Sequence, residues 1–176
     1  MMQKILSSTL LASLLVLAGC GGGETKSTST PPSEPAPAAP AAEPVSVENG
    51  VKVVHLTGND LMKFNLATIE AAPGEALRVE LKNVGKMPKQ AMAHNFILLQ
   101  PMSDADLNAL GITASMAAPT YMPKDMSKVI AHTTKMLGPG ESETIDFKAP
   151  TEPGEYPYIC TFPGHFATMR GKLIVK

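Results

Sequence analysis

The chain has 176 residues and a formal net charge of −1 at pH 7, with 15 basic and 16 acidic side chains spread along it. This near-balance, without a basic stripe, argues against a nucleic-acid partner and against a membrane contact held by charge alone. The chain contains only two cysteines, Cys20 and Cys160.

Residues 1–19 have the pattern of a secretory signal peptide. A single positive charge at Lys4 precedes an apolar run that is too short to span a bilayer comfortably. The run ends in Leu-Ala-Gly before Cys20, the pattern of a bacterial lipobox, so we expect Cys20 to carry the lipid anchor of the mature protein. The alternative is an ordinary signal peptide with an incidental cysteine. Lipidation predicts a protein anchored in the bacterial cell envelope, facing the periplasm or the cell exterior. Gly21 favours the outer membrane if the cell is Gram-negative.

The next segment has the composition of a tether. Residues 21–49 are rich in Pro, Ala, Ser and Thr and have almost no large apolar side chains. Burial of so little apolar surface cannot offset the entropy lost on ordering, so residues 20–49 are predicted to be a lipidated, disordered tether. A processed propeptide is the alternative. Residues 50–176 then form one domain, long enough for a single hydrophobic core.

Short β-rich segments follow one another in this domain, separated by Pro-Gly turns. In residues 77–83, three apolar side chains alternate with charged ones, which predicts a strand with one buried face. The other predicted strands are residues 51–57, 94–99, 127–133, 143–148, 155–160 and 172–176.

One segment breaks this rhythm. A capping box at Ser103–Asp106 predicts a short helix through Leu110, in a flap between two strands. About eight short strands, turn-rich connections and one helical flap indicate an all-β fold, an eight-stranded Greek-key β-sandwich.

Cys160 is the most informative residue of the domain. If Cys20 carries lipid, Cys160 has no partner, and a leftover cysteine in an exported protein calls for an explanation such as a bound metal. Cys160 ends a predicted strand, His165 lies on a Pro-Gly turn, and Met169 begins the return strand. A thiolate, an imidazole and a thioether can therefore converge. Zinc sites rarely use methionine, so this donor set favours copper.

A trigonal copper site requires a second histidine, and His94 at the start of a predicted strand is the best candidate. Asn95 beside it is expected to brace the ligand loops by hydrogen bonds. His55 and His132 lie in other predicted strands and are expected to be surface or structural residues. Taken singly, a buried cysteine is usually a small hydrophobic residue, and Met169 or His94 would be structural. The combination in an exported chain is what favours a metal.

Four segments also carry a family resemblance: GNDLMKFN (58–65), MPKQAMAHNF (87–96), SKVIAHT (127–133) and CTFPGHFATMRGKLIVK (160–176). They resemble azurin, a blue-copper electron-transfer protein of the cupredoxin family, and the resemblance extends over residues 51–176. The lipobox and the tether also resemble the membrane-tethered members, the lipid-modified azurins and auracyanins.

This resemblance implies one type 1 copper ion, held in a plane by His94, Cys160 and His165, with Met169 as a weak axial ligand. The carbonyl of Ala93 occupies the place of a second, distant axial oxygen, where azurins usually have glycine. Asn95 matches the asparagine that ties the ligand loops together in the family.

The resemblance also implies a function. Single electrons would pass by Cu(I)/Cu(II) cycling between transiently docked redox proteins, such as cytochromes or copper oxidoreductases, and the protein would not be an enzyme. Electrons would leave through the edge of His165, which would reach the surface inside an apolar docking patch. The expected members of this patch are Met62, Met87, Met92, Met116, Phe162, Pro163 and Ala167.

Three features depart from azurins. The domain has no second cysteine and so no disulfide, Asn83 stands where many azurins have a titrating histidine, and Phe96 replaces a tryptophan. The first departure implies that copper binding and core packing carry more of the stability. The second implies a reduction potential without that histidine's pH dependence.

Two other functions fit parts of the sequence. A copper(I) carrier or storage protein of the periplasm or cell surface would use closely spaced, exposed methionines, whereas the methionines here are scattered. A thiol hydrolase would use Cys160 with His165 or His94 as its base, but no sequence feature marks an oxyanion site.

Overall fold

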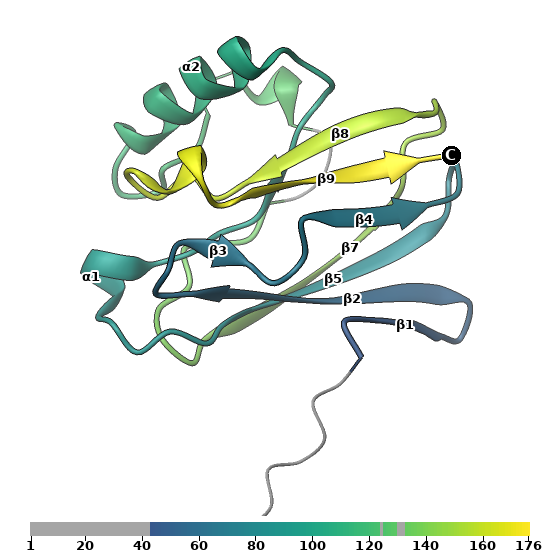
Figure 1. The fold of residues 1–176 in the computed structure, drawn as a ribbon, viewed down its shortest axis with the longest axis horizontal. Coiled ribbons are helices and arrows are strands. Elements are labelled where there is room, and N and C mark those ends of the chain that lie inside the picture. Colours follow the sequence, from purple (N-terminus) through teal and green to yellow (C-terminus); the bar gives the residue numbers. More distant parts are fainter. Residues whose placement is uncertain (1–42, 124, 130–132) are drawn as a thin grey trace, which may run out of the picture. The chain divides into compact units, whose positions relative to one another are not determined.

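The computed structural model describes residues 43–123, 125–129 and 133–176, which form two β-sheets and one longer helix (Figure 1). The first sheet has five strands in the order β1-β2-β5-β7, with β3 added on β2. Its strands are β1 (Val45–Glu48), β2 (Val51–Asn59), β3 (Lys63–Phe64), β5 (Ala76–Asn83) and β7 (Ser142–Lys148). Strands β2 and β5 are parallel, whereas β5 and β7 are antiparallel.

The second sheet has four strands in the order β4-β9-β8-β6. They are β4 (Thr68–Ala71), β6 (Ile97–Leu98), β8 (Gly154–Ile159) and β9 (Arg170–Val175). Strands β8 and β9 are antiparallel neighbours, and the loop that joins them lies at the end of the sandwich opposite the C-terminus (Figure 1). The predicted all-β sandwich is therefore confirmed.

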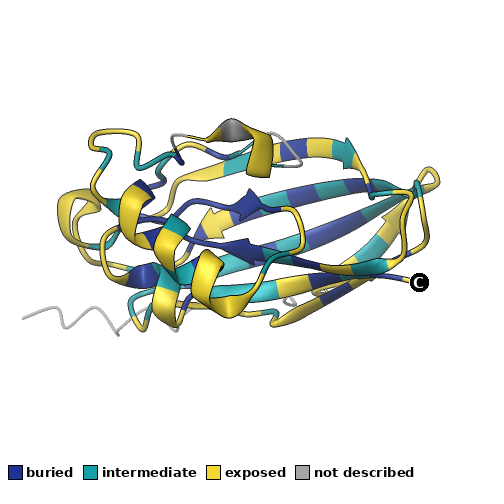
Figure 2. Ribbon diagram, turned by 90° about the horizontal axis from the view of Figure 1, so that it is seen from above, coloured by how far each residue is buried: buried dark blue, intermediate teal, exposed yellow. Residues whose placement is uncertain are grey.

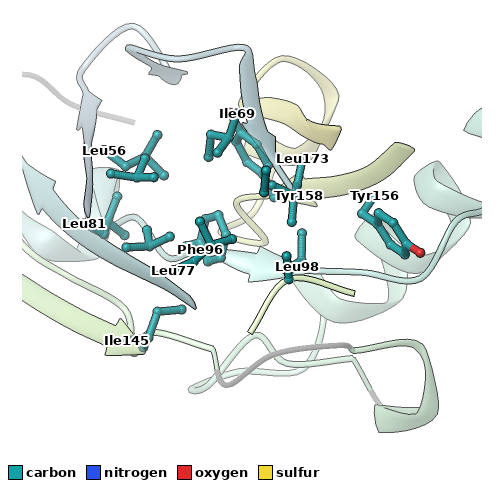
Figure 3. Packing of buried hydrophobic residues seen from close by; sticks show 14 of the residues in the cluster. Leu56, Ile69, Leu77, Leu81, Phe96, Leu98, Ile145, Tyr156, Tyr158 and Leu173 are labelled. Atoms are coloured by element: carbon teal, nitrogen blue, oxygen red, sulfur yellow. The ribbon is translucent and has the colours of Figure 1, made fainter. Parts of the chain in front are cut away.

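Apolar side chains from both sheets meet between the layers. On β5 the predicted inward residues Leu77, Val79 and Leu81 are buried. Buried residues also alternate with more exposed residues along other strands (Figure 2). Leu56 and Leu81 from one sheet face Tyr158 and Leu173 from the other (Figure 3). Such interdigitation gives a close-packed interior that resists deformation.

The predicted helix begins where expected but is longer. Helix α2 (Asp104–Ser115) is capped by Ser103, whose hydroxyl accepts a hydrogen bond from the Asp106 N–H at 3.2 Å. The predicted end at Leu110 is wrong, because α2 continues to Ser115 and also buries Gly111 and Ala114. Gly111 lies directly under the ring of Phe166 in the short 3₁₀ helix η2 (His165–Ala167), so packing rather than capping sets the length of α2.

The end of the tether and two of the predicted strands differ most from the structure. Residues 45–48, assigned to the tether, form β1, because Asn49 and Gly50, with φ of 52° and 79°, make the turn of a tight hairpin. Residues 94–99 are strand only at Ile97–Leu98.

The third difference concerns the strand predicted over residues 127–133. Met126–Lys128 forms a 3₁₀ helix, η1, and Val129 makes one isolated bridge to Leu99. Residues 130–132 lie outside the described part of the chain. Of the described helices, which also include α1 (Lys89–Met92), none combines the length and apolarity needed to cross a bilayer.

Candidate metal centre

Three side chains predicted as ligands converge at one end of the sandwich. The donor atoms of His94, Cys160 and His165 all lie within 4.8 Å of one another, and all three residues are buried. His94 lies shortly before β6, Cys160 directly follows β8, and His165 begins η2. Segments 66 residues apart in the chain therefore meet at one point, as the hydrogen bonds between positions 95 and 161 confirm.

The loop from Cys160 to Met169 is closed by its own backbone. The Cys160 N–H donates to the Met169 carbonyl at 3.0 Å, and the Met169 N–H donates to the His165 carbonyl at 2.7 Å. Gly164 has a φ of 82°, a left-handed conformation that glycine adopts without strain, and the His165 N–H then donates to the Phe162 carbonyl. The end of β8 and the start of β9 thus bring Cys160, His165 and Met169 together, as the spacing predicts.

His94 is fixed from outside this loop. Its N–H donates to the Leu137 carbonyl at 3.0 Å, and the Leu137 N–H donates back at 2.7 Å. The neighbouring Ala93 carbonyl lies 4.0 Å from the Cys160 sulfur. Ala93, Cys160 and Met169 also share a buried apolar cluster, so both predicted axial groups border the same site.

Asn95 braces the ligand loops through Thr161. Its side-chain oxygen accepts from the Thr161 N–H at 2.8 Å, and its amide donates to the Thr161 hydroxyl at 2.9 Å. That hydroxyl in turn donates to the Tyr121 carbonyl of the flap. Sequence reasoning expected the role of Asn95 but missed Thr161, whose position next to Cys160 is the signal that could have found it.

Asn83 is a second brace, which sequence reasoning also missed. Its fully buried amide donates to the carbonyls of Met92 and Leu137 at 3.1 and 3.0 Å and accepts from the Gly85 N–H at 2.8 Å. It thereby joins the end of β5 to the segment just before His94 and to Leu137, the bridge partner of His94. Position 83 is occupied by a group that does not titrate.

Burial controls the protonation of the three donors. Loss of hydration raises the pKa of the Cys160 thiol to about 12, although the N–H groups of Asn95 and Phe162 at the sulfur act in the opposite direction. Burial, together with the neighbouring His94, lowers the pKa of His165 to about 4. Burial also lowers the pKa of His94, although the backbone of Asn59 and the negative charge of Asp60 act in the opposite direction. Both imidazoles are therefore neutral near pH 7, the form that binds metals.

The residues present fit a copper ion. Within the described residues, both buried ring nitrogens of His94 have no hydrogen-bond partner. A buried polar atom without a partner is costly, and a metal ion would satisfy one of these nitrogens. One thiolate, two imidazoles and a nearby thioether are the donors of a type 1 copper site.

The metal-free protein is expected to lose stability on acidification. An unfolded histidine has its ordinary pKa of about 6.5, so the unfolded chain takes up a proton that folded His165 does not accept until about pH 4. The free energy of unfolding should therefore fall by about 3 kcal/mol as pH decreases across this window. Urea unfolding at a series of pH values measures the loss. His165→Gln should remove most of this loss; a flat profile in the parent would contradict the assignment.

The side chains of the predicted docking patch differ in their exposure. Pro163, Ala167, Met87 and Met116 are exposed, the last two by 42% and 72% of their surface. Met62 and Met92 are partly buried.

Two of the expected surface features are largely buried in the structure. Phe162, expected in the patch, is buried because its ring packs between Tyr121 and His165. The edge of His165, expected at the surface, exposes only 2% of the residue's area. Sequence reasoning also missed Leu61 and Val84, which are 71% and 48% exposed on neighbouring loops.

The two remaining histidines do not join the site. His55 on β2 contacts the Glu80 carboxylate of β5 at 3.1 Å, which agrees with a structural role. His132 lies outside the described residues.

Comparisons with known proteins agree with this geometry. Residues 51–176 match the model of the family described as copper binding proteins, plastocyanin/azurin family. The chain is 39% identical to azurin of Achromobacter denitrificans over 121 residues, 67% of this chain and 80% of that protein. It is 37% identical to azurin of Pseudomonas aeruginosa over 129 residues, 70% of this chain and 84% of that protein.

A solved structure is similar as well. Auracyanin A, a blue copper protein from Chloroflexus aurantiacus, matches with a TM-score of 0.65 and 28% identity, over 72% of this chain and all of that one. The protein therefore belongs to the plastocyanin/azurin family of copper-binding proteins, the blue-copper cupredoxins.

Proposed function

We propose that this protein is a membrane-anchored, type 1 blue-copper electron carrier and not an enzyme. The observation that supports this most directly is the buried convergence of His94, Cys160 and His165 in a chain of the copper-binding family. His94, Cys160 and His165 would hold the copper, Met169 would add a weaker thioether ligand, and the Ala93 carbonyl would border the same site. Bound copper supplies a one-electron couple between Cu(II) and Cu(I).

The residues of the chain keep this site rigid. Electron transfer breaks no bonds, so the ligands should lie in nearly the same places in both oxidation states. Asn95 and Asn83 fix the ligand loops by buried hydrogen bonds, and the packed sandwich behind them resists deformation. The N–H groups of Asn95 and Phe162 stabilise negative charge on the Cys160 sulfur. Burial of the three donors keeps water from the site.

Reversible redox cycling tests the function. The copper-loaded protein should be intensely blue, bleach with ascorbate and recover its colour on reoxidation, through repeated cycles with no loss of metal. Copper lost to a mild chelator after reduction would instead indicate a copper(I) carrier. A cysteine that iodoacetamide labels in the loaded protein would contradict ligation.

We propose that redox partners dock on the exposed apolar side chains around the site, here Leu61, Val84, Met87, Pro163 and Ala167. Met87 and Leu61 lie beside Asp60, whose carboxylate accepts from the Lys86 and Met87 N–H groups, and the Val84 N–H donates to Gly58. Adaptable methionines and exposed apolar patches suit transient docking. Partners of this kind include cytochromes and other copper proteins.

Met87→Lys is expected to slow electron self-exchange roughly tenfold, because two copies that meet through the patch would bring like charges together. NMR line broadening in mixtures of oxidised and reduced protein measures this rate. Val47→Lys is the matched control: Val47 is 68% exposed on β1 and pairs with Lys52, ~20 Å along β2 from Gly58. Equal rates in the two variants would place the docking surface elsewhere.

We propose that Cys20 carries lipid and that the segment behind it tethers the domain to the cell envelope. The lipobox pattern at Leu17–Cys20 supports this. In a bacterial host that processes lipoproteins, the mature protein should partition into the detergent phase of Triton X-114, and Cys20→Ser should move it to the aqueous phase. Partition of both forms into the aqueous phase would exclude an anchor at this position.

A further inference from the structure

We propose that Gly58 is a positioning residue of the metal centre: its missing side chain sets where the His94 ring and the Met169 methyl group lie. The inference rests on the proposed copper site. Gly58 lies on β2 and offers no donor atom, yet it controls the positions of two ligands that come from other parts of the chain.

The contacts of Gly58 carry the argument. A Cβ atom built at position 58 would lie 2.6 Å from Cε of Met169, and 2.8 and 3.0 Å from Cδ2 and Cγ of His94. Real Cβ atoms essentially never come within 3.0 Å of a heavy atom outside their own and the adjoining residues. The two side chains therefore rest directly on the backbone of β2, in space that any other residue would fill.

The backbone itself does not require glycine at this position. Gly58 is the second-last residue of β2, and its φ lies outside the left-handed region. Glycine in a strand weakens it and often marks a close approach by another group. Here the approaching groups are two proposed copper ligands, so the space and not the conformation explains the residue.

The backbone at Gly58 is also unable to retreat from a larger side chain. Gly58 pairs with Phe64 of β3 on one edge and with Asn83 of β5 on the other. In addition, the Val84 N–H donates to the Gly58 carbonyl at 2.9 Å. A methyl group at position 58 must therefore displace the Met169 methyl, the His94 ring or both.

This displacement affects the copper-bound protein more than the metal-free protein. Without metal, the flexible Met169 side chain can move aside at little cost. With metal, both side chains must keep their donor atoms at the copper. The added methyl group would then have to displace the ligands from their positions at the metal. Gly58→Ala should thus weaken copper binding more than it weakens the fold.

The test compares two glycine substitutions in the full-length chain. Gly58→Ala is expected to lower copper affinity about tenfold or more in competition with a chelator, and to shift the visible spectrum and reduction potential. Gly171→Ala in β9 is the matched control, since its Cβ would lie 2.3 Å from the Tyr158 ring and its three nearest contacts all belong to Tyr158. It should lower stability while the folded protein keeps the parent's affinity and spectrum.

The metal-free protein gives a readout independent of copper. In Gly58→Ala the NMR signal of the Met169 methyl group should move, and in Gly171→Ala it should stay. The proposal would be overturned if Gly58→Ala kept the copper affinity, the visible spectrum and the Met169 methyl signal of the parent. It would also be overturned if the free energy of copper binding fell by no more than the free energy of unfolding. If the parent itself gave no blue copper complex, the proposed function would fail, whereas the methyl signal would still report the contact with Gly58.

Discussion

Replacement of Cys160 by serine should abolish the blue colour of the copper-loaded protein. The intense absorption of a type 1 site comes from charge transfer between the thiolate and copper, and a serine hydroxyl cannot provide it. In the structure, the Cys160 sulfur lies 3.6 Å from Nδ1 of His165 and accepts hydrogen bonds from the N–H groups of Asn95 and Phe162. These two N–H groups favour the thiolate, and the described residues contain no other cysteine, so no neighbouring thiolate can substitute.

The measurement is the visible spectrum of both proteins after addition of Cu(II). Both should carry Cys20→Ser, so that Cys160 is the sole thiol of the parent and no lipid is attached. Met169→Leu is the matched control, because loss of a weak axial ligand should alter the potential and leave the blue band. A Cys160→Ser protein that stays blue would show that the copper lies elsewhere.

Asn95→Ala is expected to destabilise the metal-free protein by about 3 kcal/mol. The change removes two buried hydrogen bonds to Thr161 and leaves the Thr161 N–H without a partner away from water. An unsatisfied buried donor costs more than the bond itself contributed. Urea unfolding of the metal-free protein measures the effect without any contribution from copper.

Asn65 provides a matched control with the same chemistry at the surface. Its side-chain oxygen accepts from the Thr57 N–H at 2.7 Å, and its amide donates to the His55 carbonyl at 3.0 Å, but the residue is exposed. Water can replace these bonds, so Asn65→Ala should cost only about 1 kcal/mol. Equal losses in the two variants would mean that the buried position of Asn95 contributes nothing extra.

Much of the site could be predicted because its donors are close in sequence. Cys160, His165 and Met169 lie on one loop between two strands, and such a loop closes locally through its own hydrogen bonds. The choice of His94 relied on its place at the start of a strand and on a family resemblance. The alternation of Leu77, Val79 and Leu81 predicted a buried face correctly, since period-two patterns depend only on the strand itself.

The features that sequence reasoning missed depend on contacts between distant segments. Asn83 braces the site only because β5 ends beside the segments that carry Met92 and Leu137. Gly58 matters only because Met169 and His94 pack on it. The hairpin of β1 is different, because its Asn49-Gly50 turn is a strong local signal that the Pro- and Ala-rich composition before it obscured.

The position of β9 in the second sheet has a consequence for the timing of folding. This last strand pairs in parallel with β4, about a hundred residues earlier, and in antiparallel with β8, so the sheet is not closed until the C-terminal residues are present. Pairing over such separations is slow, because the entropy of closing a long loop is lost before the strand contacts can compensate for it. The second sheet is therefore expected to form late in folding. The loop between β8 and β9, which carries Cys160, His165 and Met169, should become fixed in the same late step.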